Sequence, residues 1–432
     1  MRSLTLALAL AFAPAAFAQD LQQLYEAARG YDATVLAARA LAASAEFRAA
    51  QSEALKRPSA QLGASATVAQ VNPALGNSGD SNAAQASLSA RLPLFNRGSD
   101  ATIEQARRSL EAAAAELEAA EQELMVRVAQ TYFDVLGAQD TLATTRQSKA
   151  ATSEQLASAR RNFEVGTATI TDTREAQARF DLTTAQEIAA ENDLRAKRIA
   201  LDQLVGRAGI TPRPLLVPVV LPPVLPADPE VWVGTGDLQH PTIRRARVAL
   251  DVALLETAKA RAGQLPTLDA VASLSSTHTR GTGVQLPGTN GNSSVGVQLT
   301  WPLYTGGSVQ NRIRETLTLE DKARNDLEAA RRGVAQATRV AYFGVLSGQA
   351  QVKALEAAES STKLALEATQ LGYRVGVRVN LDVLNAQTQL FQTQRDLAKA
   401  RYDVLVGSLR LRQASGQLSP GDVGALNRLL AP

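Results

Sequence analysis

Four segments of the chain alternate between apolar and polar residues at every second position. Two lie in the first half of the sequence, at about 61–70 and 85–95, and two in the second half, at about 268–279 and 295–304. A period of two over about ten residues predicts a half-buried strand, and this length suits a tilted strand in a membrane. A loop rich in Gly, Asn, Ser and Pro separates the members of each pair, at 72–82 and at 280–292. The pattern therefore predicts two β-hairpins, at about 61–95 and 268–304.

Most of the remaining chain carries a helical pattern. From Ile103 to Leu124 a large aliphatic residue recurs every seven residues, in a proline-free segment that runs from position 100 to about 162. A second heptad runs from Val383 to Leu411, and a small residue or threonine follows each large residue by three. Such seams predict long helices that pack closely. Shorter helices are predicted at about 33–56 and 242–262, each ended by a proline.

The sequence contains a tandem duplication. Residues 161–172 align with 371–382 at a shift of 210, and the same shift pairs Tyr132-Phe133 with Tyr342-Phe343. The segment 211–229 contains seven prolines, which predicts an extended connector. We therefore expect a first repeat at 19–210, a linker at 211–229, a second repeat at 230–416 and a C-terminal tail at 417–432. Each repeat is predicted to be a long helical hairpin with a β-hairpin at one end and a Val-Gly turn at the other.

The first 18 residues are typical of a cleavable secretory signal. Arg2 precedes an apolar run from Leu4 to Phe12, and an Ala-Phe-Ala sequence ends at Ala18. An ordinary buried helix is the alternative. No later segment reaches the roughly 20 apolar residues of a membrane helix. We expect an exported protein that, if it spans a membrane, does so with strands.

Composition excludes several kinds of chemistry. The 432 residues include no cysteine and two histidines, His240 and His278, which excludes disulfides, thiolate metal sites and a lipid on an N-terminal cysteine. Because no catalytic triad, metal cluster or phosphate-binding loop is found in the sequence, we expect no enzyme activity, no cofactor and no bound metal. The 45 basic and 42 acidic residues nearly balance, which implies no nucleic-acid partner. Aromatic residues make up only 4% of the chain, which fits helices packed through small residues.

The predicted strands cannot close a membrane barrel within one chain. Known membrane barrels use at least about eight strands, and an open sheet would leave unpaired backbone groups in lipid. Closure by several copies is therefore required. Two copies would supply eight strands and three would supply twelve, and the small residues on the strands do not decide between them.

Two turn motifs complete the pattern: Phe-Glu-Val-Gly-Thr-Ala-Thr-Ile-Thr-Asp at 163–172 and Tyr-Arg-Val-Gly-Val-Arg-Val-Asn-Leu-Asp-Val-Leu-Asn at 373–385. With the duplication and the hairpins, they resemble the TolC family of outer-membrane efflux and type I secretion channels, over essentially the whole chain after the signal. The resemblance implies a mainly α fold with a β part. Tandem-duplicated long helical hairpins would form an α-barrel in the periplasm, and four strands per chain would contribute to a homotrimeric, 12-stranded transmembrane β-barrel in the outer membrane. It also implies two partners, a periplasmic adaptor protein and an inner-membrane transporter, either ABC-type or proton-driven. The absence of cysteine indicates the unacylated branch.

The resemblance also implies site residues. In the family a polar network holds the periplasmic tip shut, and the matching positions here are Thr171, Asp172, Tyr373 and Arg378. A ring of aspartates at the constriction corresponds to Asp382. Where some relatives carry a second aspartate one turn on, this chain has Asn385, which weakens the expected negative charge and affinity for blocking multivalent cations. The expected adaptor-docking residues are Val165, Gly166, Val375 and Gly376.

Structural roles for these residues remain open beside the functional ones. Gly166 and Gly376 are expected to permit a positive φ in a helix-to-helix turn. Asp172 and Asp382 lie where helices are predicted to begin, so both are also candidate N-caps. Trp301 and Tyr304 are candidates for an aromatic belt at the membrane surface or for packing residues.

The leading functional hypothesis is a passive exit duct of a tripartite system. It would conduct drugs, other small molecules or secreted proteins, with energy supplied by the partner transporter. The alternative is the periplasmic adaptor itself, which also contains a helical hairpin. An exported structural coiled coil is a third possibility, but it would not need alternating hairpins.

Overall fold

The computed structural model describes residues 19–71, 78–282 and 287–431. The predicted signal at 1–18 and parts of both predicted loops lie outside these residues. Two compact units can be distinguished. The first, the helical unit, comprises Met1–Ala37, Glu118–Pro241 and Arg332–Pro432, and the second, the sheet unit, comprises Ala38–Leu117 and Thr242–Arg331. Each unit draws on both predicted repeats, so the proposed repeat boundaries stay a prediction about the sequence.

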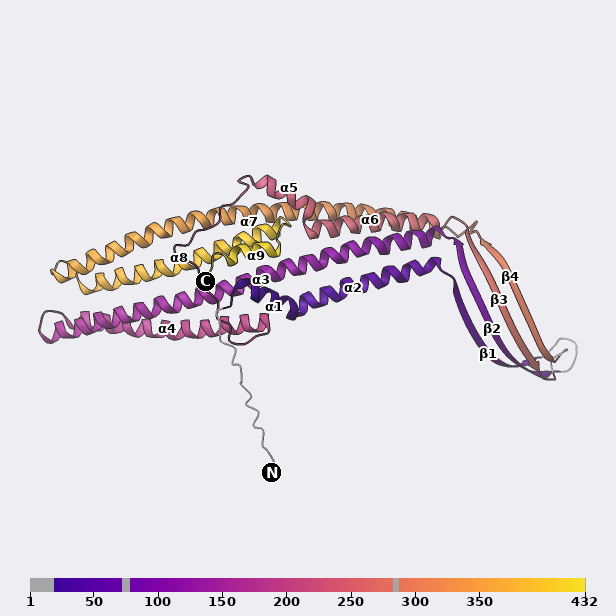
Figure 1. Ribbon diagram of the computed structural model, residues 1–432, viewed down its shortest axis with the longest axis horizontal. Coiled ribbons are helices and arrows are strands. Elements are labelled where there is room, and N and C mark those ends of the chain that lie inside the picture. Colours follow the sequence, from indigo (N-terminus) through magenta and orange to yellow (C-terminus); the bar gives the residue numbers. More distant parts are fainter. Residues whose placement is uncertain (1–18, 72–77, 283–286, 432) are drawn as a thin grey trace, which may run out of the picture. The chain divides into compact units, whose positions relative to one another are not determined.

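Helices make up most of the described chain (Figure 1). In the first half they are α1 (Leu21–Tyr31), α2 (Ala33–Glu53), the 3-10 turn η1 (Ala54–Lys56), α3 (Arg97–Glu164) and α4 (Ile170–Val205). In the second half they are α5 (Pro229–Gln239), α6 (Pro241–Ala262), α7 (Ser308–Arg374), α8 (Asn380–Ala414) and α9 (Pro420–Asn427). The two longest, α3 and α7, contain 68 and 67 residues. The heptad prediction of long helices is confirmed, whereas α1, α5 and α9 were not predicted.

The strands form one antiparallel sheet in the order β1-β2-β3-β4. They are β1 (Ser59–Val71), β2 (Gly79–Phe95), β3 (Thr267–Arg280) and β4 (Gly288–Thr300). Both predicted hairpins are present, and β2 pairs with β3 from the other half of the sequence. Strands β2, β3 and β4 extend into the segments predicted as loops. The order leaves β1 and β4 as the two edges of the sheet.

The second hairpin ends earlier than the sequence pattern predicted. Alternation continues to position 304, but β4 ends at Thr300. Pro302 lies two residues after the end of β4 and has no backbone N–H to donate to a neighbouring strand. Gly306 and Gly307 then turn the chain, with φ of 62° and 83°. In the first hairpin Pro93 lies inside β2, where the register shifts between Pro93 and Phe95. The Trp301 indole N–H donates to the Gln264 carbonyl at 3.2 Å.

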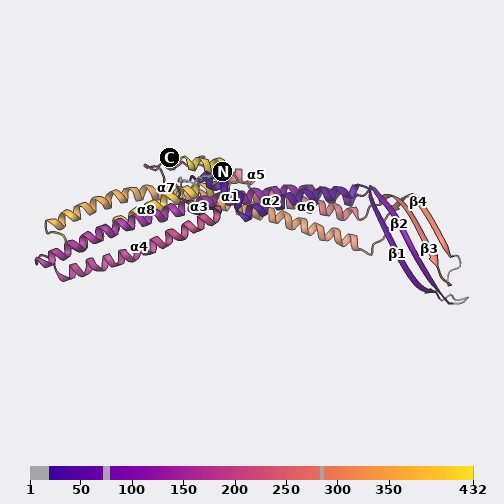
Figure 2. The ribbon, with the colours of Figure 1, turned by 60° about the horizontal axis from the view of Figure 1, so that its bottom comes forward.

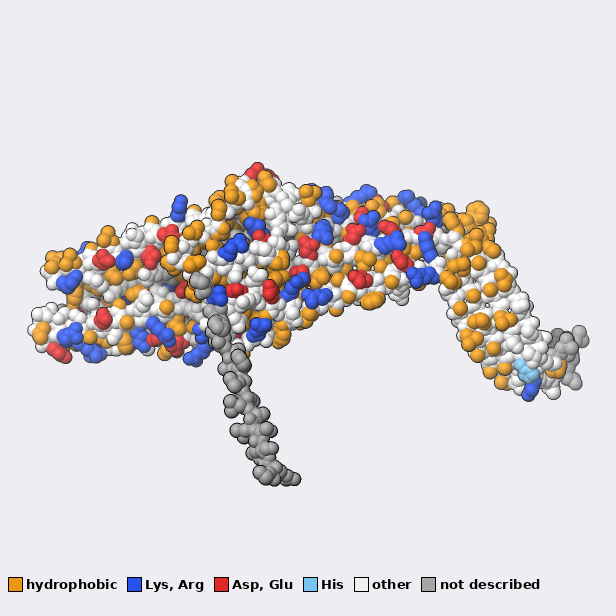
Figure 3. All heavy atoms as spheres, viewed as in Figure 1, with side chains coloured by type: hydrophobic (Ala, Val, Ile, Leu, Met, Phe, Trp, Pro, Cys, Tyr) orange, Lys and Arg blue, Asp and Glu red, His pale blue; other side chains and the backbone are white. Residues whose placement is uncertain are grey.

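The two faces of the sheet differ in chemistry. Residues directly opposite in the ladder share a face, and the register places Leu62, Leu88 and Leu274 side by side in one row. The same face carries, in a second row, Ala60, Ala90, Ala272 and Val295. The other face carries Ser, Thr, Gln and Asn, with the Arg91–Asp269 ion pair at 2.5 Å. Figure 3 shows hydrophobic side chains spread over the strands.

The apolar face of the sheet is exposed in the single chain. Val68 is 82% exposed, Leu62 77% and Val295 89%. Apolar positions on β1 run from Ala60 to Val68, which is about 26 Å at roughly 3.3 Å per residue. At the strand tilt of about 35–45° found in outer-membrane barrels, this length spans about 20 Å along the membrane normal, most of their roughly 25 Å apolar band.

Polar contacts tie the helices of the sheet unit together. Glu256 on α6 accepts from Gln105 of α3 at 2.9 Å and from Arg312 of α7 at 2.7 Å. Arg107 of α3 pairs with Glu53 of α2 at 2.9 Å. Arg107 and Arg312 therefore link neighbouring helices of this unit through ion pairs.

The helical unit holds the largest apolar cluster among the described residues, and four aromatic residues, Tyr25, Tyr132, Phe133 and Tyr402, lie in it. The rings of Phe133 and Tyr402 stack with centroids 5.6 Å apart, and Tyr132 meets Phe133 edge-on at 5.5 Å. Helix α1 packs Leu21 and Leu24 into the same core. Three rings therefore meet at the centre of this cluster, and most of its other members are aliphatic.

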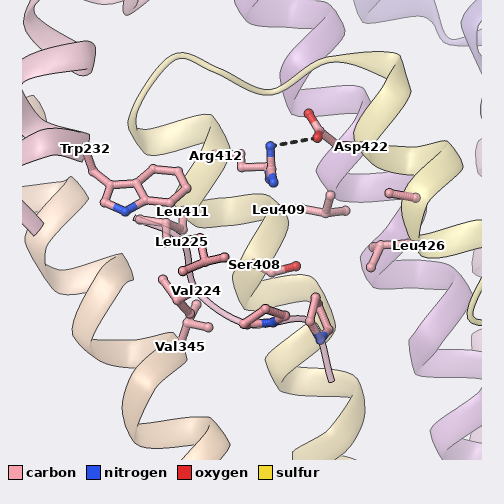
Figure 4. Close-up of a pocket in the computed structure, with 13 residues that line it drawn as sticks. Val224, Leu225, Trp232, Val345, Ser408, Leu409, Leu411, Arg412, Asp422 and Leu426 are labelled. Atoms are coloured by element: carbon pink, nitrogen blue, oxygen red, sulfur yellow. Dashed lines mark ion pairs between the residues drawn. The ribbon is translucent and has the colours of Figure 1, made fainter. Parts of the chain in front are cut away.

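A second apolar cluster lies under the proline-rich connector. Figure 4 shows the pocket lined by the connector residues Val224 and Leu225 together with Trp232 of α5 and Leu411 of α8. The Trp232 indole N–H donates to the Pro226 carbonyl at 2.9 Å. The Arg412–Asp422 ion pair, at 2.9 Å, joins α8 to α9 beside it. These contacts anchor the connector and the C-terminal helix to the helical unit, and we assign the pocket to packing.

A buried tyrosine–carboxylate pair crosses the core of the helical unit. The Tyr402 hydroxyl donates to Oδ2 of Asp140 at 2.6 Å. Burial raises the pKa of the Asp140 carboxyl, and the Tyr402 hydrogen bond acts in the opposite direction. Burial also raises the pKa of Tyr402, as does the nearby Asp140 charge. The hydroxyl therefore stabilises a carboxylate that is poorly solvated.

We predict that Tyr402→Phe destabilises the helical unit by about 1–3 kcal/mol at neutral pH, because a buried carboxylate loses its donor. A carboxyl whose folded-state pKa is raised binds its proton more tightly when folded, so its contribution to stability falls as pH rises above the unfolded pKa. Removing the hydroxyl raises the folded-state pKa further. The fall in the free energy of unfolding caused by Tyr402→Phe should therefore be larger at about pH 8 than at about pH 4. Circular dichroism during denaturant unfolding measures it.

Tyr342→Phe is the matched control for this experiment. The Tyr342 hydroxyl donates to the main-chain carbonyl of Ala227, which does not titrate. Removing the Tyr342 hydroxyl should lower the free energy of unfolding by a similar amount at both pH values. A Tyr402→Phe penalty that is as independent of pH as the control would contradict the role given to Asp140.

Candidate functional site

Two helix-to-helix turns of the same geometry connect α3 to α4 and α7 to α8. Gly166 has φ of 78° and Gly376 has φ of 80°, a region that favours glycine over other residues. The Gly166 amide donates to the Phe163 carbonyl at 3.0 Å, and the Gly376 amide donates to the Tyr373 carbonyl at 3.2 Å. These pairs are related by the 210-residue shift, so each duplicated motif builds the same turn.

Both turns present apolar side chains to solvent. Val165 is 73% exposed and Val375 is 65% exposed. Other large exposed apolar residues at the two turns are Phe163, Ile170, Val377 and Val379. In Figures 1 and 2 both turns lie at the same end of the paired helices, with α4 and α8 in contact. The predicted docking residues therefore share an exposed, apolar end of the helical unit.

The sequence of α4 explains where this helix begins. Thr169 is the N-cap, and its hydroxyl accepts from the Asp172 amide at 3.2 Å. The Asp172 carboxylate accepts in return from the Thr169 amide at 2.9 Å, which completes a capping box. Asp172 was predicted as a possible N-cap, but it occupies the third helical position. Thr171 lies at the second helical position and is exposed.

The predicted residues of the second motif make contacts within this chain. The Tyr373 hydroxyl accepts from the Asn162 side-chain amide of α3 at 3.2 Å. Arg378 pairs with Asp382 at 3.6 Å. Asp382 is in the first turn of α8, whose N-cap is Val379, a residue that makes no side-chain cap. Within the described part of the chain, the Arg378–Asp382 ion pair is the only direct side-chain contact between two of the six predicted gate residues.

The structure adds a buried polar contact that the sequence reasoning missed. Asn380 is 2% exposed. Its Oδ1 accepts from the Gln155 side chain of α3, and its Nδ2 donates to the Asp172 carbonyl of α4 at 3.4 Å. The 210-residue shift places Ile170 opposite Asn380, so a polar residue replaces an apolar one in the duplicated motif. That replacement was the available signal.

A further contact between α4 and α8 was also missed. Arg179 donates from Nη2 to Oδ1 of Asn385 at 2.9 Å. An apolar cluster of Leu156, Ala159, Ala176 and Leu384 packs α3, α4 and α8 together. The contact between α4 and α8 therefore combines buried apolar packing with the Arg179–Asn385 hydrogen bond.

Nothing in the described residues suggests a cofactor or metal centre. No group of three or more acidic or histidine side chains there is arranged to hold a metal ion. The helices that the structure describes also contain no stretch long and apolar enough to cross a membrane.

Comparison with known sequences supports one family. The family model described as "Outer membrane efflux protein" matches residues 24–207 and 237–417. The outer membrane protein TolC of Vibrio cholerae is 31% identical over 417 residues, which cover 96% of this chain and 94% of that protein. TolC of Escherichia coli is 32% identical over 72% of this chain and 65% of its own length. The alkaline protease secretion protein AprF of Pseudomonas aeruginosa is 34% identical over 70% of this chain and 63% of its own length.

Solved structures show the same fold at lower identity. The outer membrane protein VceC of Vibrio cholerae has a TM-score of 0.78 at 20% identity, covering 92% of this chain and 97% of that chain. A membrane protein from Pseudomonas aeruginosa has a TM-score of 0.81 at 20% identity, over 93% and 98% of the two chains. The open state of the MtrE outer membrane channel of Neisseria gonorrhoeae gives 0.73 at 21% identity, over 93% and 90%.

These comparisons confirm the predicted mainly α fold with a β part, and they give the adaptor alternative no support. Two matched stretches of the family model cover most of the chain, and the TolC relative of Vibrio cholerae aligns along nearly its whole length. The chain belongs to the outer membrane efflux protein family, the family of TolC.

Proposed function

We propose that three copies of this chain form an exit duct across the outer membrane. The observation that carries the proposal is the sheet, which is apolar on one face, polar on the other and open at both edges. In lipid the unpaired N–H and C=O groups of β1 and β4 need partners. Pairing β4 of one copy with β1 of the next satisfies them, and three copies give twelve strands around a polar lumen.

The duct conducts drugs, other small molecules or secreted proteins, driven by an inner-membrane transporter that it meets through a periplasmic adaptor. The names of its relatives support both kinds of cargo, because they include protease secretion proteins and an efflux protein. The exposed apolar turns suit a protein partner, since exposed apolar patches commonly mark interaction sites. Val165, Gly166, Val375 and Gly376 are the proposed docking residues.

The proposed gate residues lie near these turns: Thr171 and Asp172 on α4, Tyr373 on α7, Arg378 in the turn between α7 and α8, and Asp382 and Asn385 on α8. In the single chain Tyr373 bonds to α3 and Arg378 bonds within its own motif. These contacts are exposed or half-buried and individually weak. We propose that they hold the tip shut together with contacts between copies, and that the adaptor releases them.

The trimer and the gate are tested by conductance in planar bilayers. A double variant, Tyr373→Phe with Arg378→Ser, should raise the single-channel conductance several-fold, because the hydroxyl and the guanidinium that hold the tip are removed. Arg374→Ser, which removes a neighbouring arginine outside the proposed network, should leave conductance unchanged. Unaltered conductance in the double variant would contradict the gate, and a wild-type protein that forms no trimers or pores would contradict the duct.

Docking is tested by photo-crosslinking to the adaptor in cells. Val165→Asp combined with Val375→Asp should abolish crosslinking, because a charged side chain cannot be buried against an apolar partner without a large cost. The trimer should persist, because both residues lie in exposed turns. Val220→Asp alters an apolar residue of similar exposure, 70%, and should crosslink normally. Retained crosslinking in the double variant would place the docking site elsewhere.

The buried Asn380 contact is expected to hold α8 against α3 and α4. Asn380→Ala leaves the Gln155 amide and the Asp172 carbonyl without this partner. We expect the free energy of unfolding to fall by about 1–3 kcal/mol. Hydrogen exchange of the purified trimer should show faster amide exchange around 155–175 and 380–390. Thr388→Ala removes only a bond to Leu384 in the same helix and serves as the control. Equal exchange in the two variants would argue against this role.

A further inference from the structure

An arginine lies beside Asn385, which is one turn after Asp382 on α8. Asp382 and Asn385 are three residues apart on α8, so they share one side of that helix. Val383, Leu384 and Gln387 are buried on the other side. Asn385 is exposed, and Asp382 is half-exposed. The side of α8 that bears the proposed constriction residues is therefore the side left open in the single chain.

Arg179 reaches this open side from the neighbouring helix. It lies seven residues after Asp172, two turns along α4, so both residues face α8. Its Nη2 donates to Oδ1 of Asn385 at 2.9 Å. This hydrogen bond fixes the guanidinium next to Asn385, and therefore close to the ring that Asp382 is proposed to form.

The two polar pairs on this side of α8 differ in charge. Asp382 is paired with Arg378 at 3.6 Å, so one negative charge meets one positive charge. The bonded partner of Arg179 is a neutral amide, and within the described chain no carboxylate lies within ion-pair distance of it. The Arg179–Asn385 pair thus carries one net positive charge, whereas the Arg378–Asp382 pair carries none. Three copies around an axis would place three such charges around the narrowest part of the duct.

We propose that Arg179 is a specificity-determining residue of the duct, which makes the constriction favour anions and resist block by multivalent cations. The proposal rests on the proposed function, because it needs the tip to surround a pore. Rings of charged side chains set ion preference in pores, and a confined site with low-dielectric walls strengthens their field. Asn385 serves as the positioning residue, since its carbonyl oxygen orients the guanidinium without neutralising it.

The test is the reversal potential of single channels of the full-length trimer under a potassium chloride gradient, together with block by hexamminecobalt(III). The wild-type channel should prefer chloride and be blocked weakly. Arg179→Gln should shift the reversal potential toward potassium and strengthen the block at least tenfold. Asn385→Asp should also shift the reversal potential toward potassium and strengthen the block, because the new carboxylate neutralises the Arg179 guanidinium.

Two controls separate charge from structure. Arg179→Lys keeps the charge and should retain most of the chloride preference. Arg174→Gln removes an exposed arginine of the same helix from a position turned away from α8, and it should behave as wild type.

The outcomes distinguish the two proposals. The role of Arg179 would be overturned if Arg179→Gln forms open channels with unchanged selectivity and block. It would also be overturned if Arg174→Gln shifts selectivity and block equally. Either result would leave the proposed duct intact. A wild-type trimer that forms no channel would overturn the duct itself. If Arg179→Gln fails to assemble, Asn385→Asp carries the test, because its substitution lies on an exposed surface.

Discussion

The requirement that every backbone polar group in lipid has a partner governs the rest of this structure. Four strands with one apolar face form an open sheet, and β1 and β4 are its edges. In lipid, where we propose that the sheet lies, a single chain could not meet the requirement, and several copies would have to associate. The pairing of β2 with β3 matters here, because it joins the two halves of the sequence into one sheet with two edges. Two separate hairpins would have four edges.

The helical parts solve a different problem, which is to pack long helices without a large globular core. Small residues in the heptads allow close approach, and the largest apolar cluster among the described residues lies where α1, α3, α4, α8 and α9 meet. Toward the turns the packing becomes more polar, with Asn380 buried and Arg179 bonded to Asn385. An interface with polar contacts can separate at lower cost than an apolar one, since water replaces its hydrogen bonds. That property suits the part of the molecule proposed to open.

Local patterns predicted the elements well and their ends less well. The alternation that marked the strands continued through Trp301 and Leu303, yet β4 stops at Thr300 because a proline and two positive-φ glycines follow. Helices α1, α5 and α9 are short, and a short helix offers too few turns for its period to be recognised. Asp172 was expected near the start of α4, but Thr169 caps the helix because it satisfies the reciprocal hydrogen bonds of a capping box.

By itself the sequence determined the strands, the long helices, the repeated turns and the family resemblance, because each depends on spacing within one segment or on motifs repeated at a fixed shift. Only the tertiary structure decided which polar residues meet across segments. Tyr402 reaches Asp140 over 262 positions, and Arg179 reaches Asn385 over 206. Such contacts depend on the axial register between neighbouring helices. A heptad specifies the face that each helix buries and leaves that register undetermined.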